Sequence, residues 1–478
     1  MTTSTTYHFI GIGGIGMSGL AELLVRQGHP VTGSDVARND ITRRLEALGV
    51  RVYLGHAPEH LGEAQVVVHT SAVKEDNPEL AAARKRGLTV LRRGEMQARL
   101  MAPHRQIAVT GAHGKTSTTA MTAAVLRAGG LDPTVLVGAV WDSLGSNAVL
   151  GAGEWFVAEA DESDGSFTYL TPEISIITNL DREHLDFYRD LEHVKEVFAG
   201  YLAHLPPGAL VVAWEGDPHL QGLLRDFPHR RLTYGLTPGA DLWADRLATR
   251  GLSQRFRLWR GERPLGEVRL PLAGPHYVLN ALAAAGVALE LGLPFAAVAQ
   301  GLAELGGLKR RLEVKGEAAG VMVIDDYGHH PTEIEATLRA VAQAFPGRRL
   351  VTAFQPHRYS RTEALLPDFF PVFGAAHLVF ITEIYAASEA PRPGVSGRLL
   401  WEGIRAHGHG GAYFAPDQAT LAAALLERLK PGDVLLTLGA GDIWRLGEEI
   451  LRRLSGGRKR TAATPPKGAE PCPGVRMA

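Results

Sequence analysis

A glycine-rich turn between an apolar strand and a helix of small residues constrains the fold of this 478-residue chain more than any other feature. The turn is Gly111 to Thr116; it follows the apolar stretch Gln106 to Thr110 and opens a helix predicted over 116–127. The backbone N–H groups of such a turn point at a bound phosphate. Lys115 adds a positive charge for the β- and γ-phosphates, and the Thr116 hydroxyl can hold Mg²⁺. The turn therefore predicts a parallel α/β domain that binds ATP.

The spacing of this loop departs from the familiar GxxxxGK[ST] pattern, because Val109 occupies the first glycine position and Gly111 lies inside the loop. The alternative interpretation is a chance GK[ST] in a glycine-rich turn. The strand before the loop, the helix after it and the acidic residues at later strand ends favour a nucleotide site.

Glu159 and His184 lie at two of those strand ends, after the predicted strands at 155–159 and 174–178. Ligands of parallel sheets gather beyond the carboxyl ends of the strands. A carboxylate and an imidazole there can complete the coordination of Mg²⁺ on the phosphates. Solvated charges are the plainer alternative, and the loop upstream favours metal.

A second glycine turn, Gly11 to Gly16, carries GxGxxG after a strand and before the predicted helix Met17 to Arg26. Asp35 follows the next strand, which completes the dinucleotide fingerprint. NAD, FAD or a UDP-sugar could supply the pyrophosphate, and a turn without ligand is the structural alternative. Since a dehydrogenase has no use for a second phosphate loop, a nucleotide-linked substrate here and ATP in the second domain are favoured.

The alternation of strands and helices changes twice along the chain, and the length suggests about three domains. We expect an α/β protein with a Rossmann-like parallel sheet at 1–102, a central P-loop domain at 103–307 and a Rossmann-like domain at 308–455. The segment from 232 to 272 predicts a small antiparallel sheet in the central domain. The remainder, 456–478, is rich in Pro, Gly and basic residues and predicts a disordered tail.

Charge and cysteine content narrow the class of partner. Lys plus Arg number 50 and Asp plus Glu 51, so no overall field attracts nucleic acid or an anionic membrane. The only cysteine, Cys472, excludes a disulfide framework and fits a reducing cytoplasm. No signal peptide and no run of about 18 apolar residues is present. We expect a cytoplasmic enzyme with small-molecule partners, no membrane span, and a monomeric or homodimeric state.

Polar side chains also crowd two strand ends of the third segment, at Asp325 to Glu333 and Gln355 to Thr362. Arginines there can bind a carboxylate with two hydrogen bonds, and His and Tyr can orient an amine or a phosphate. A pair of solvated loops is the alternative, but it would not need this density of polar and aromatic residues.

Seven blocks spread over the chain resemble the Mur ligase family. They are HFIGIGGIGMSG at 8–19, GAHGKTSTT at 111–119, EADESD at 159–164, TNLDREHLDFY at 178–188, DDYGHHPTE at 325–333, QPHRYSRT at 355–362 and YAASEAP at 385–391. DDYGHHPTE and QPHRYSRT resemble the alanine-adding branch of the family. The resemblance implies a UDP-binding domain, an ATPase domain and an amino-acid-binding domain, in that order.

The resemblance also implies the reaction. The lactyl carboxylate of UDP-N-acetylmuramate would take the γ-phosphoryl group of ATP to give an acyl phosphate, and the amine of L-alanine would then displace phosphate. The products would be UDP-N-acetylmuramoyl-L-alanine, ADP and phosphate, in peptidoglycan precursor synthesis. The alternatives are the related ligase that attaches a preformed peptide to the same substrate, a nicotinamide-dependent dehydrogenase, and a regulatory nucleotide-binding module.

The family's functional positions fall on the following residues of this sequence. The expected catalytic residues are Lys115, His329 and Arg358. The expected ATP contacts are Gly111, Ala112, His113, Gly114, Lys115, Thr116, Ser117, Asn280 and Arg311, and the expected Mg²⁺ ligands are Thr116, Glu159 and His184. The UDP-N-acetylmuramate contacts would be Gly13, Gly14, Ile15, Gly16, Met17, Ser18, Asp35, Ser71 and Arg92, and the L-alanine contacts Tyr327, His329, Arg358 and Arg361.

One departure from the family affects these assignments. The family's Gly-Arg-Arg-Phe appears as Lys309-Arg310-Arg311-Leu312, so which arginine meets phosphate is open by one residue. Lys195 lies near the position of a carbamylated lysine in some relatives and is not assigned.

Overall fold

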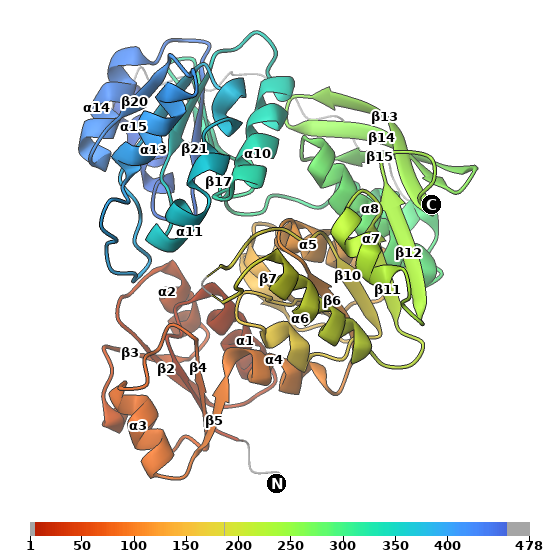
Figure 1. Cartoon of the computed structure of the whole chain (residues 1–478). Coiled ribbons are helices and arrows are strands. Elements are labelled where there is room, and N and C mark those ends of the chain that lie inside the picture. Colours follow the sequence, from red (N-terminus) through yellow and green to blue (C-terminus); the bar gives the residue numbers. More distant parts are fainter. Residues whose placement is uncertain (1–4, 186, 457–478) are drawn as a thin grey trace, which may run out of the picture.

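Three α/β units follow one another along the chain, and each has its own sheet (Figure 1). The computed structural model describes residues 5–185 and 187–456. The predicted tail at 456–478 lies outside them except for Gly456, which ends the last helix. No helix of the described part is long and apolar enough to cross a membrane. The α/β prediction with three successive sheets is confirmed.

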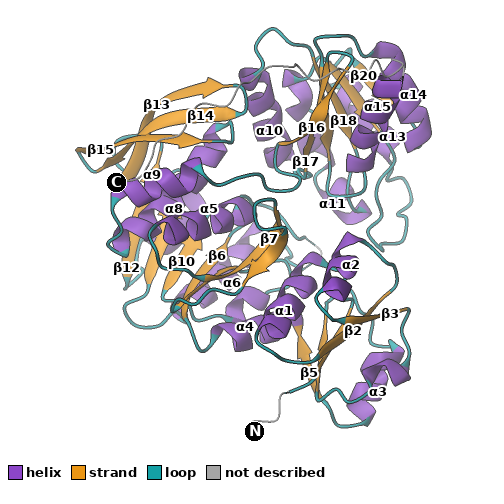
Figure 2. Ribbon diagram, turned by 180° about the vertical axis from the view of Figure 1, so that it is seen from behind, coloured by secondary structure: helices purple, strands orange, loops and turns teal. Residues whose placement is uncertain are grey.

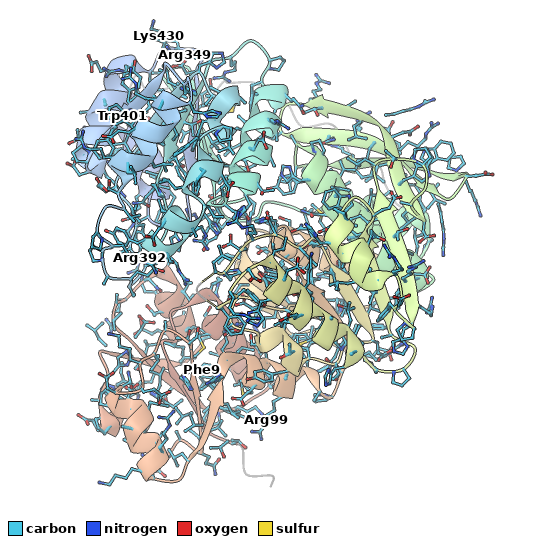
Figure 3. The ribbon with its side chains drawn as sticks, in the orientation of Figure 1. Phe9, Arg99, Arg349, Arg392, Trp401 and Lys430 are labelled. Carbon is cyan, nitrogen blue, oxygen red and sulfur yellow. The ribbon has the colours of Figure 1, made fainter. Side chains whose placement is uncertain are left out.

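The N-terminal unit is a five-stranded parallel sheet in the order β3-β2-β1-β4-β5. β1 and β4 are buried along their whole length, as expected of parallel strands covered on both faces. Phe9 of β1, labelled in Figure 3, lies inside this unit and is fully buried. The elements are β1 (Tyr7–Ile10), α1 (Ile15–Arg26), β2 (Val31–Asp35), α2 (Asp40–Ala47), β3 (Arg51–Leu54), η1 (Pro58–Leu61), β4 (Val66–His69), α3 (Pro78–Lys85), β5 (Thr89–Arg92) and α4 (Arg93–Met101).

The central unit is built on a ten-stranded sheet in the order β15-β14-β13-β12-β11-β10-β6-β9-β7-β8. Helices α5, α8 and α9 pack together on it (Figure 2). The strands are β6 (Arg105–Thr110), β7 (Thr134–Trp141), β8 (Ser146–Val149), β9 (Trp155–Glu159), β10 (Ile174–Ile177), β11 (Leu210–Trp214), β12 (Arg230–Gly235), β13 (Leu242–Arg250), β14 (Ser253–Arg260) and β15 (Arg263–Leu270). The helices are α5 (Lys115–Ala128), η2 (Ser166–Tyr169), α6 (Leu191–Ala203), α7 (Pro218–Leu224), α8 (Pro275–Glu290) and α9 (Phe295–Ala303).

The predicted antiparallel sheet at 232–272 needs correction. β13, β14 and β15 do pair antiparallel, but they extend the main sheet and do not form a separate one. Leu232 and Tyr234 belong to β12, which pairs parallel with β11. Both side chains are buried, and α8 packs on this strand. Because a helix-covered strand joins the parallel part, the antiparallel part begins only at β13.

The C-terminal unit is a six-stranded sheet in the order β16-β17-β21-β18-β19-β20, in which only β16 is antiparallel to its neighbour. Its strands are β16 (Glu313–Ala318), β17 (Val321–Asp326), β18 (Leu350–Phe354), β19 (Leu378–Ile381), β20 (Ala412–Phe414) and β21 (Val434–Leu438). Its helices are α10 (Pro331–Ala344), α11 (Tyr359–Ala364), α12 (Leu366–Phe369), η3 (Val372–Ala375), α13 (Gly397–Ala406), α14 (Gln418–Arg428) and α15 (Trp444–Gly456). The boundaries near 102 and 308 stay predictions; the chain changes sheet between β5 and β6 and between β15 and β16.

Side chains join the N-terminal unit to the edge of the central sheet. α1 packs on β7 and β8. The Ser146 hydroxyl donates to the buried Glu22 carboxylate at 2.7 Å, and the Asn147 amide donates to the Ile15 carbonyl at 2.7 Å. These bonds hold the start of α1, and with it the first glycine turn, against the central unit.

Candidate active site

The turn between β6 and α5 depends on glycine at two positions. Gly111 and Gly114 have φ of 115° and 82°, a region that disfavours side chains. A Cβ on Gly114 would lie 2.7 Å from Oδ1 of Asn280. No side chain caps α5, and the first N–H groups of a helix have no partner within the helix itself. Such a turn suits an anion.

Lys115, the first residue of α5, folds back over this loop. Its ammonium donates to the carbonyls of Gly111 at 2.7 Å and Ala112 at 3.1 Å, and to the Glu162 carboxylate at 2.7 Å. Burial lowers the pKa of Lys115, but Glu162 and other nearby carboxylates outweigh burial and leave the pKa raised. The lysine is therefore a fixed positive charge at the loop.

Two of the three expected metal ligands lie together. The Thr116 hydroxyl donates to Oε2 of Glu159 at 2.9 Å, and the Gly138 N–H donates to the same oxygen at 2.9 Å. Burial raises the pKa of Glu159, which indicates a carboxylate that would gain from a nearby cation. His184 instead lies 3.2 Å from Glu162, on the Lys115 side of the loop. A hydroxyl and a half-buried carboxylate fit Mg²⁺.

A cleft of about 660 Å³ opens beside this loop and is lined by all three units. The first glycine turn, the phosphate loop and the start of the C-terminal unit meet there. The expected site residues that line it are Gly14, Ile15, Gly16, Met17, Ser71, Ala112, His113, Gly114, Lys115, Thr116, Glu159, His184, Arg311, Tyr327 and His329.

The first glycine turn is held from within its own unit. The Gly13 N–H donates to Oδ2 of Asp35 at 2.8 Å, and the buried Ser18 hydroxyl donates to the Ile15 carbonyl at 3.0 Å. Asp35 thus supports the turn and, like Gly13 and Ser18, does not line the cleft.

Arg92 ends β5 and is exposed, whereas the next residue, Arg93, lines the cleft. The Arg93 guanidinium donates to Asp161 at 2.8 Å, and so ties the N-terminal unit to the acidic end of β9. The expected contact of Arg92 with UDP-N-acetylmuramate stays a prediction. Arg93, and not Arg92, lines the cleft in which that contact was expected.

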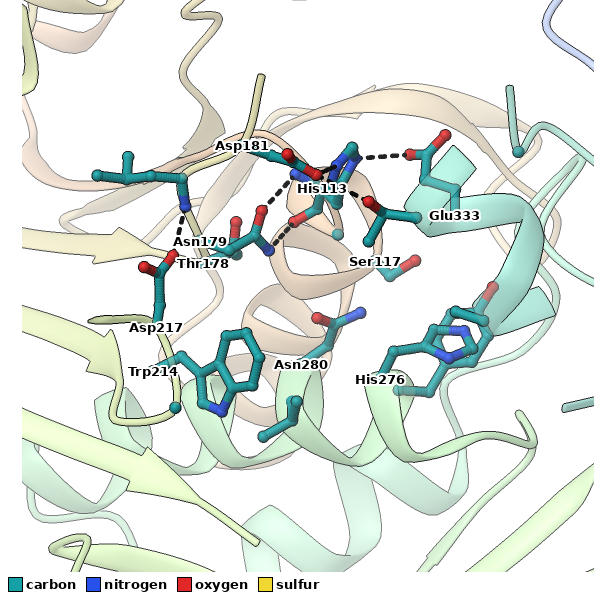
Figure 4. A pocket seen from close by; sticks show the side chains of 18 of the residues that line it. His113, Ser117, Thr178, Asn179, Asp181, Trp214, Asp217, His276, Asn280 and Glu333 are labelled. Atoms are coloured by element: carbon teal, nitrogen blue, oxygen red, sulfur yellow. Dashed lines mark hydrogen bonds and ion pairs between the residues drawn. The ribbon is translucent and has the colours of Figure 1, made fainter. Parts of the chain in front are cut away.

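A second cavity of about 410 Å³ lies on the other side of the loop (Figure 4). Trp214, Tyr234 and Tyr277 give it large aromatic walls, and Asn280 lies beside Gly114. Its expected ATP residues are His113, Gly114, Ser117, Asn280 and Arg311. An aromatic pocket that continues from a phosphate loop suits a nucleoside.

The two arginines at 310 and 311 have different surroundings. Arg310 donates to Asp325 at 3.1 Å and to backbone carbonyls of Ala440 and Gly441, which fixes it within the C-terminal unit. Arg311 donates to the Thr116 hydroxyl at 3.4 Å. Of the two, Arg311 is therefore the one beside the phosphate loop.

The expected amino-acid residues fall in two places. Tyr327 and His329 line the large cleft, whereas Arg358 and Arg361 line a separate cavity of about 150 Å³. The Arg361 fork donates to one Glu183 oxygen at 2.9 and 2.5 Å. Burial lowers the pKa of His329 to about 4, so its imidazole is neutral near pH 7. The structure does not gather these four residues around one cavity.

The phosphate loop also contacts the C-terminal unit through His113, a contact that sequence reasoning missed. Its Nε2 lies 2.8 Å from Asp181 and its Nδ1 3.3 Å from Glu333 of α10 (Figure 4). Burial lowers the pKa of His113, but the two carboxylates raise it to about 10. The Thr332 hydroxyl also donates to Asp181 at 2.9 Å.

Glu162, Glu183, Asp181 and Glu333 all lie in the sequence blocks singled out above, yet none was assigned a role. The sequence blocks that contain these four residues could be recognised. Which of the carboxylates faces the phosphate loop, however, depends on the backbone geometry of the turns.

Three family models match the chain in succession. They are described as the Mur ligase family catalytic domain, the Mur ligase middle domain and the Mur ligase glutamate ligase domain, and match residues 6–105, 109–288 and 310–441. The UDP-N-acetylmuramate–L-alanine ligase of Desulfosudis oleivorans is 51% identical over 449 residues, which cover 93% of this chain and 98% of that protein. The ligase of the same name from Myxococcus xanthus is 48% identical and covers 94% of each chain.

Solved structures agree with these matches. The UDP-N-acetylmuramate-alanine ligase MurC of Thermotoga maritima superposes with a TM-score of 0.82 at 29% identity, over 95% of this chain and 100% of that one. The MurF ligase of Thermotoga maritima in complex with ADP has a TM-score of 0.62 at 18% identity, over 89% of this chain and 95% of that one, and shares the fold. The chain therefore belongs to the Mur ligase family.

Proposed function

We propose that this protein is an ATP-dependent ligase that joins L-alanine to the lactyl carboxylate of UDP-N-acetylmuramate, in peptidoglycan precursor synthesis. The products are UDP-N-acetylmuramoyl-L-alanine, ADP and phosphate. The observation that carries the proposal is the cleft of about 660 Å³, in which the first glycine turn and the phosphate loop face the C-terminal unit. One cleft can bring a UDP-linked carboxylate to the γ-phosphate of ATP. Relatives with this name match the chain over nearly its whole length.

The phosphate loop performs the first half of the reaction. A carboxylate is a poor acyl donor at neutral pH, and its phosphorylation supplies a leaving group. The loop N–H groups and Lys115 offset charge on the transferred phosphoryl group, because such transfer rests on positioning and electrostatics. Asn280, beside Gly114, and the aromatic pocket hold the nucleoside of ATP.

Mg²⁺ fits beside this loop. Thr116 and Glu159 would hold it, since their oxygens converge and the Glu159 carboxylate is half-buried. The ion would supply positive charge to the phosphates. His184, paired with Glu162, would complete the site from the Lys115 side.

The C-terminal unit performs the second half. The alanine amine must lose a proton before it attacks the acyl phosphate. His329, neutral because its pKa is lowered to about 4, lines the cleft and can receive that proton or orient the amine. Tyr327 lines the same cleft. Arg358 and Arg361, which line the separate cavity of about 150 Å³, would bind the alanine carboxylate once their side chains turn toward this cleft. Since Arg361 binds Glu183 here, it must exchange partners when alanine arrives.

Phosphate release from ATP tests the proposal. The protein is supplied with Mg²⁺ and UDP-N-acetylmuramate, together with L-alanine, glycine, L-serine or a short peptide. Release should require both UDP-N-acetylmuramate and L-alanine. Equal rates with the peptide would favour the peptide-attaching ligase, and release without the muramate would contradict the proposal.

We further propose that the protein works in the cytoplasm as a monomer or a homodimer. This fits a substrate and cosubstrate that are both small and charged. Sedimentation velocity of the full chain distinguishes the two oligomeric states, and a larger assembly would contradict both.

A further inference from the structure

Two histidines and a carboxylate from two different units converge at the phosphate loop. His113 belongs to the loop, Asp181 follows β10, and His330 precedes α10 of the C-terminal unit. One ligand atom of each residue lies within 4.8 Å of the other two. His330 is buried, with 4% of its side chain exposed, while His113 and Asp181 border the cavities and give access from solvent.

The spacing of the three atoms suits a transition metal. Oδ2 of Asp181 is 2.8 Å from Nε2 of His113 and 3.6 Å from Nδ1 of His330. Two ligands of a tetrahedral zinc ion, each ~2.0–2.1 Å from the metal, are roughly 3.3 Å apart. Both distances lie close to that value, so small movements of the side chains would complete the geometry.

The opposite nitrogens of both histidines already have acceptors. Nδ1 of His113 lies 3.3 Å from Glu333, and Nε2 of His330 lies 3.3 Å from the Arg182 carbonyl and 3.6 Å from Glu183. A histidine that binds a metal donates its far N–H to a carboxylate or a backbone carbonyl, which fixes the tautomer. Both rings meet this condition independently, with their near nitrogens facing Asp181. Nδ1 of His330 also accepts the N–H of Thr332 at 3.3 Å, a capping bond of α10 that the metal would replace.

The carboxylate of Asp181 is oriented as well. It accepts a hydrogen bond from the Thr332 hydroxyl at 2.9 Å. Ligating carboxylates are themselves held by such bonds.

We propose that His113, Asp181 and His330 form a binding site for a transition-metal ion of the Zn²⁺ class, separate from the Thr116–Glu159 pair. Two imidazoles and one carboxylate favour Zn²⁺, Co²⁺ or Ni²⁺ over Mg²⁺. On binding, the metal replaces the proton that Nε2 of His113 shares with Asp181, and that proton passes to solvent. Water fills the remaining position.

The bound ion would regulate turnover because of where the ion lies. His113 borders both the large cleft and the aromatic cavity. A metal there joins the phosphate loop to the start of α10, so that the central and C-terminal units cannot separate and the loop cannot adjust to ATP. Bound metal therefore inhibits turnover.

Co²⁺ titration of the full chain tests the site without relying on activity. Saturating Mg²⁺ is present to occupy the Thr116–Glu159 pair, and visible absorption reports Co²⁺ with imidazole ligands in a low-coordinate site. His330→Asn removes the ligand nitrogen but keeps a residue that caps helices well. His407→Ala, at an exposed histidine outside the cluster, is the matched control.

The expected result is one Co²⁺ per chain with a strong visible band, bound at least ~10-fold more weakly by His330→Asn and unchanged in His407→Ala. Asp181→Asn is the second variant and should weaken binding similarly, which guards against misfolding of the first. Equal Co²⁺ affinity in the wild type and both cluster variants would overturn the proposal.

Inhibition of phosphate release by Zn²⁺ tests the regulatory role of the site. With saturating Mg²⁺, the Zn²⁺ concentration for half-inhibition should be at least ~10-fold higher in His330→Asn than in the wild type, each relative to its own metal-free rate. An unchanged ratio would refute the regulatory role of this site. The Co²⁺ band remains informative even if the proposed ligase reaction were wrong.

Discussion

The two glycine turns of this protein share a backbone design and differ in the side chains around it. Both follow a parallel strand and open a helix, α1 or α5, that has no capping side chain. The carboxylate of Asp35 occupies one N–H of the first turn, at Gly13. The second turn is instead crossed by the ammonium of Lys115 and bordered by Glu159 and Glu162.

This difference separates a turn that only binds its ligand from a turn that takes part in the reaction. The first turn is fixed by neutral backbone and one carboxylate, which suits a ligand that must only stay in place. The second presents a cation between the buried carboxylate of Glu162 and the half-buried one of Glu159, an arrangement that can stabilise charge as it moves. By contrast, α2, α3, α6 and α14 begin after Asn or Asp side chains that cap them. Both glycine turns thus open helices without a capping side chain, a feature that they share with α8 and α9 of the central unit.

The largest expected effect comes from Lys115→Ala. Loss of the ammonium should lower kcat about 10³-fold, because the other cation of the loop, His113, is held by Asp181 and Glu333. The affinity for UDP-N-acetylmuramate, bound at the first turn, should stay within about 2-fold, as measured by calorimetry. Lys85→Ala, at an exposed lysine at the end of α3, is the control. Loss of UDP-sugar binding in Lys115→Ala would mean that the turns are not independent.

The second-largest loss of kcat is expected from Glu159→Gln. The amide keeps the hydrogen bond from Gly138 but loses the negative charge that would hold Mg²⁺. We expect kcat to fall ~10²-fold, since a metal contributes several kcal/mol to charge stabilisation. The Mg²⁺ dependence of phosphate release should shift to higher concentration. An unchanged Mg²⁺ dependence would exclude Glu159 as a ligand.

The first turn depends on a buried carboxylate of its own unit. Glu79 accepts hydrogen bonds from Ser34, whose carbonyl in turn accepts from Gly11 and Ile12 of the turn. Burial alone raises the pKa of Glu79, but His8, Ser34 and His60 lower it to about 2.

Because the pKa of Glu79 in the folded protein lies below its ordinary value of 4.5, its contribution to stability is present above that value and is lost as the pH falls toward 2. Glu79→Gln should cost ~2 kcal/mol at pH 7, a difference that shrinks in acid. Hydrogen exchange of the β1 amides, measured from pH 6 to pH 3, reports it. A difference that is constant with pH would contradict the assignment.

The smallest expected effect comes from replacing one glycine of each turn, Gly14 or Gly114, with alanine. Gly14 has an extended backbone, and a Cβ there meets its nearest atom, the Gly11 carbonyl, at 3.5 Å. Gly114 is left-handed and faces Asn280. Gly114→Ala should weaken ATP binding about 10-fold, from ~1–2 kcal/mol of strain. Gly14→Ala should leave both ATP affinity and the thermal midpoint nearly unchanged. Similar losses in both variants would remove the distinction.

Much of the fold was predictable because its signals are local. The apolar runs and glycine turns predict β1, β6, β17 and β18 within a residue or two. The pairing of β12 was not predictable, because Leu232 and Tyr234 alternate with polar residues just as an antiparallel strand would. Only the burial of both side chains under α8 places this strand in the parallel sheet.

The sequence blocks that form the site were predictable, but the contacts between their side chains were not. Thr116 and Glu159 were expected together, and they share a hydrogen bond. Arg93 was missed because its neighbour Arg92 carries the same charge, and only the start of α4 decides which side chain faces the cleft. The contact of His113 with Glu333 joins two units, and no local pattern reports a contact between distant segments.

Transfer of oxygen is the most direct test of the claim that the loop activates a carboxylate. UDP-N-acetylmuramate labelled with ¹⁸O in its lactyl carboxylate is turned over with ATP and L-alanine, and the released phosphate is examined by mass spectrometry. If the carboxylate attacks the γ-phosphorus and phosphate later leaves with the carboxylate oxygen, each phosphate carries one ¹⁸O. Phosphate without ¹⁸O, formed together with the amide product, would contradict the acyl phosphate and the role assigned to this loop.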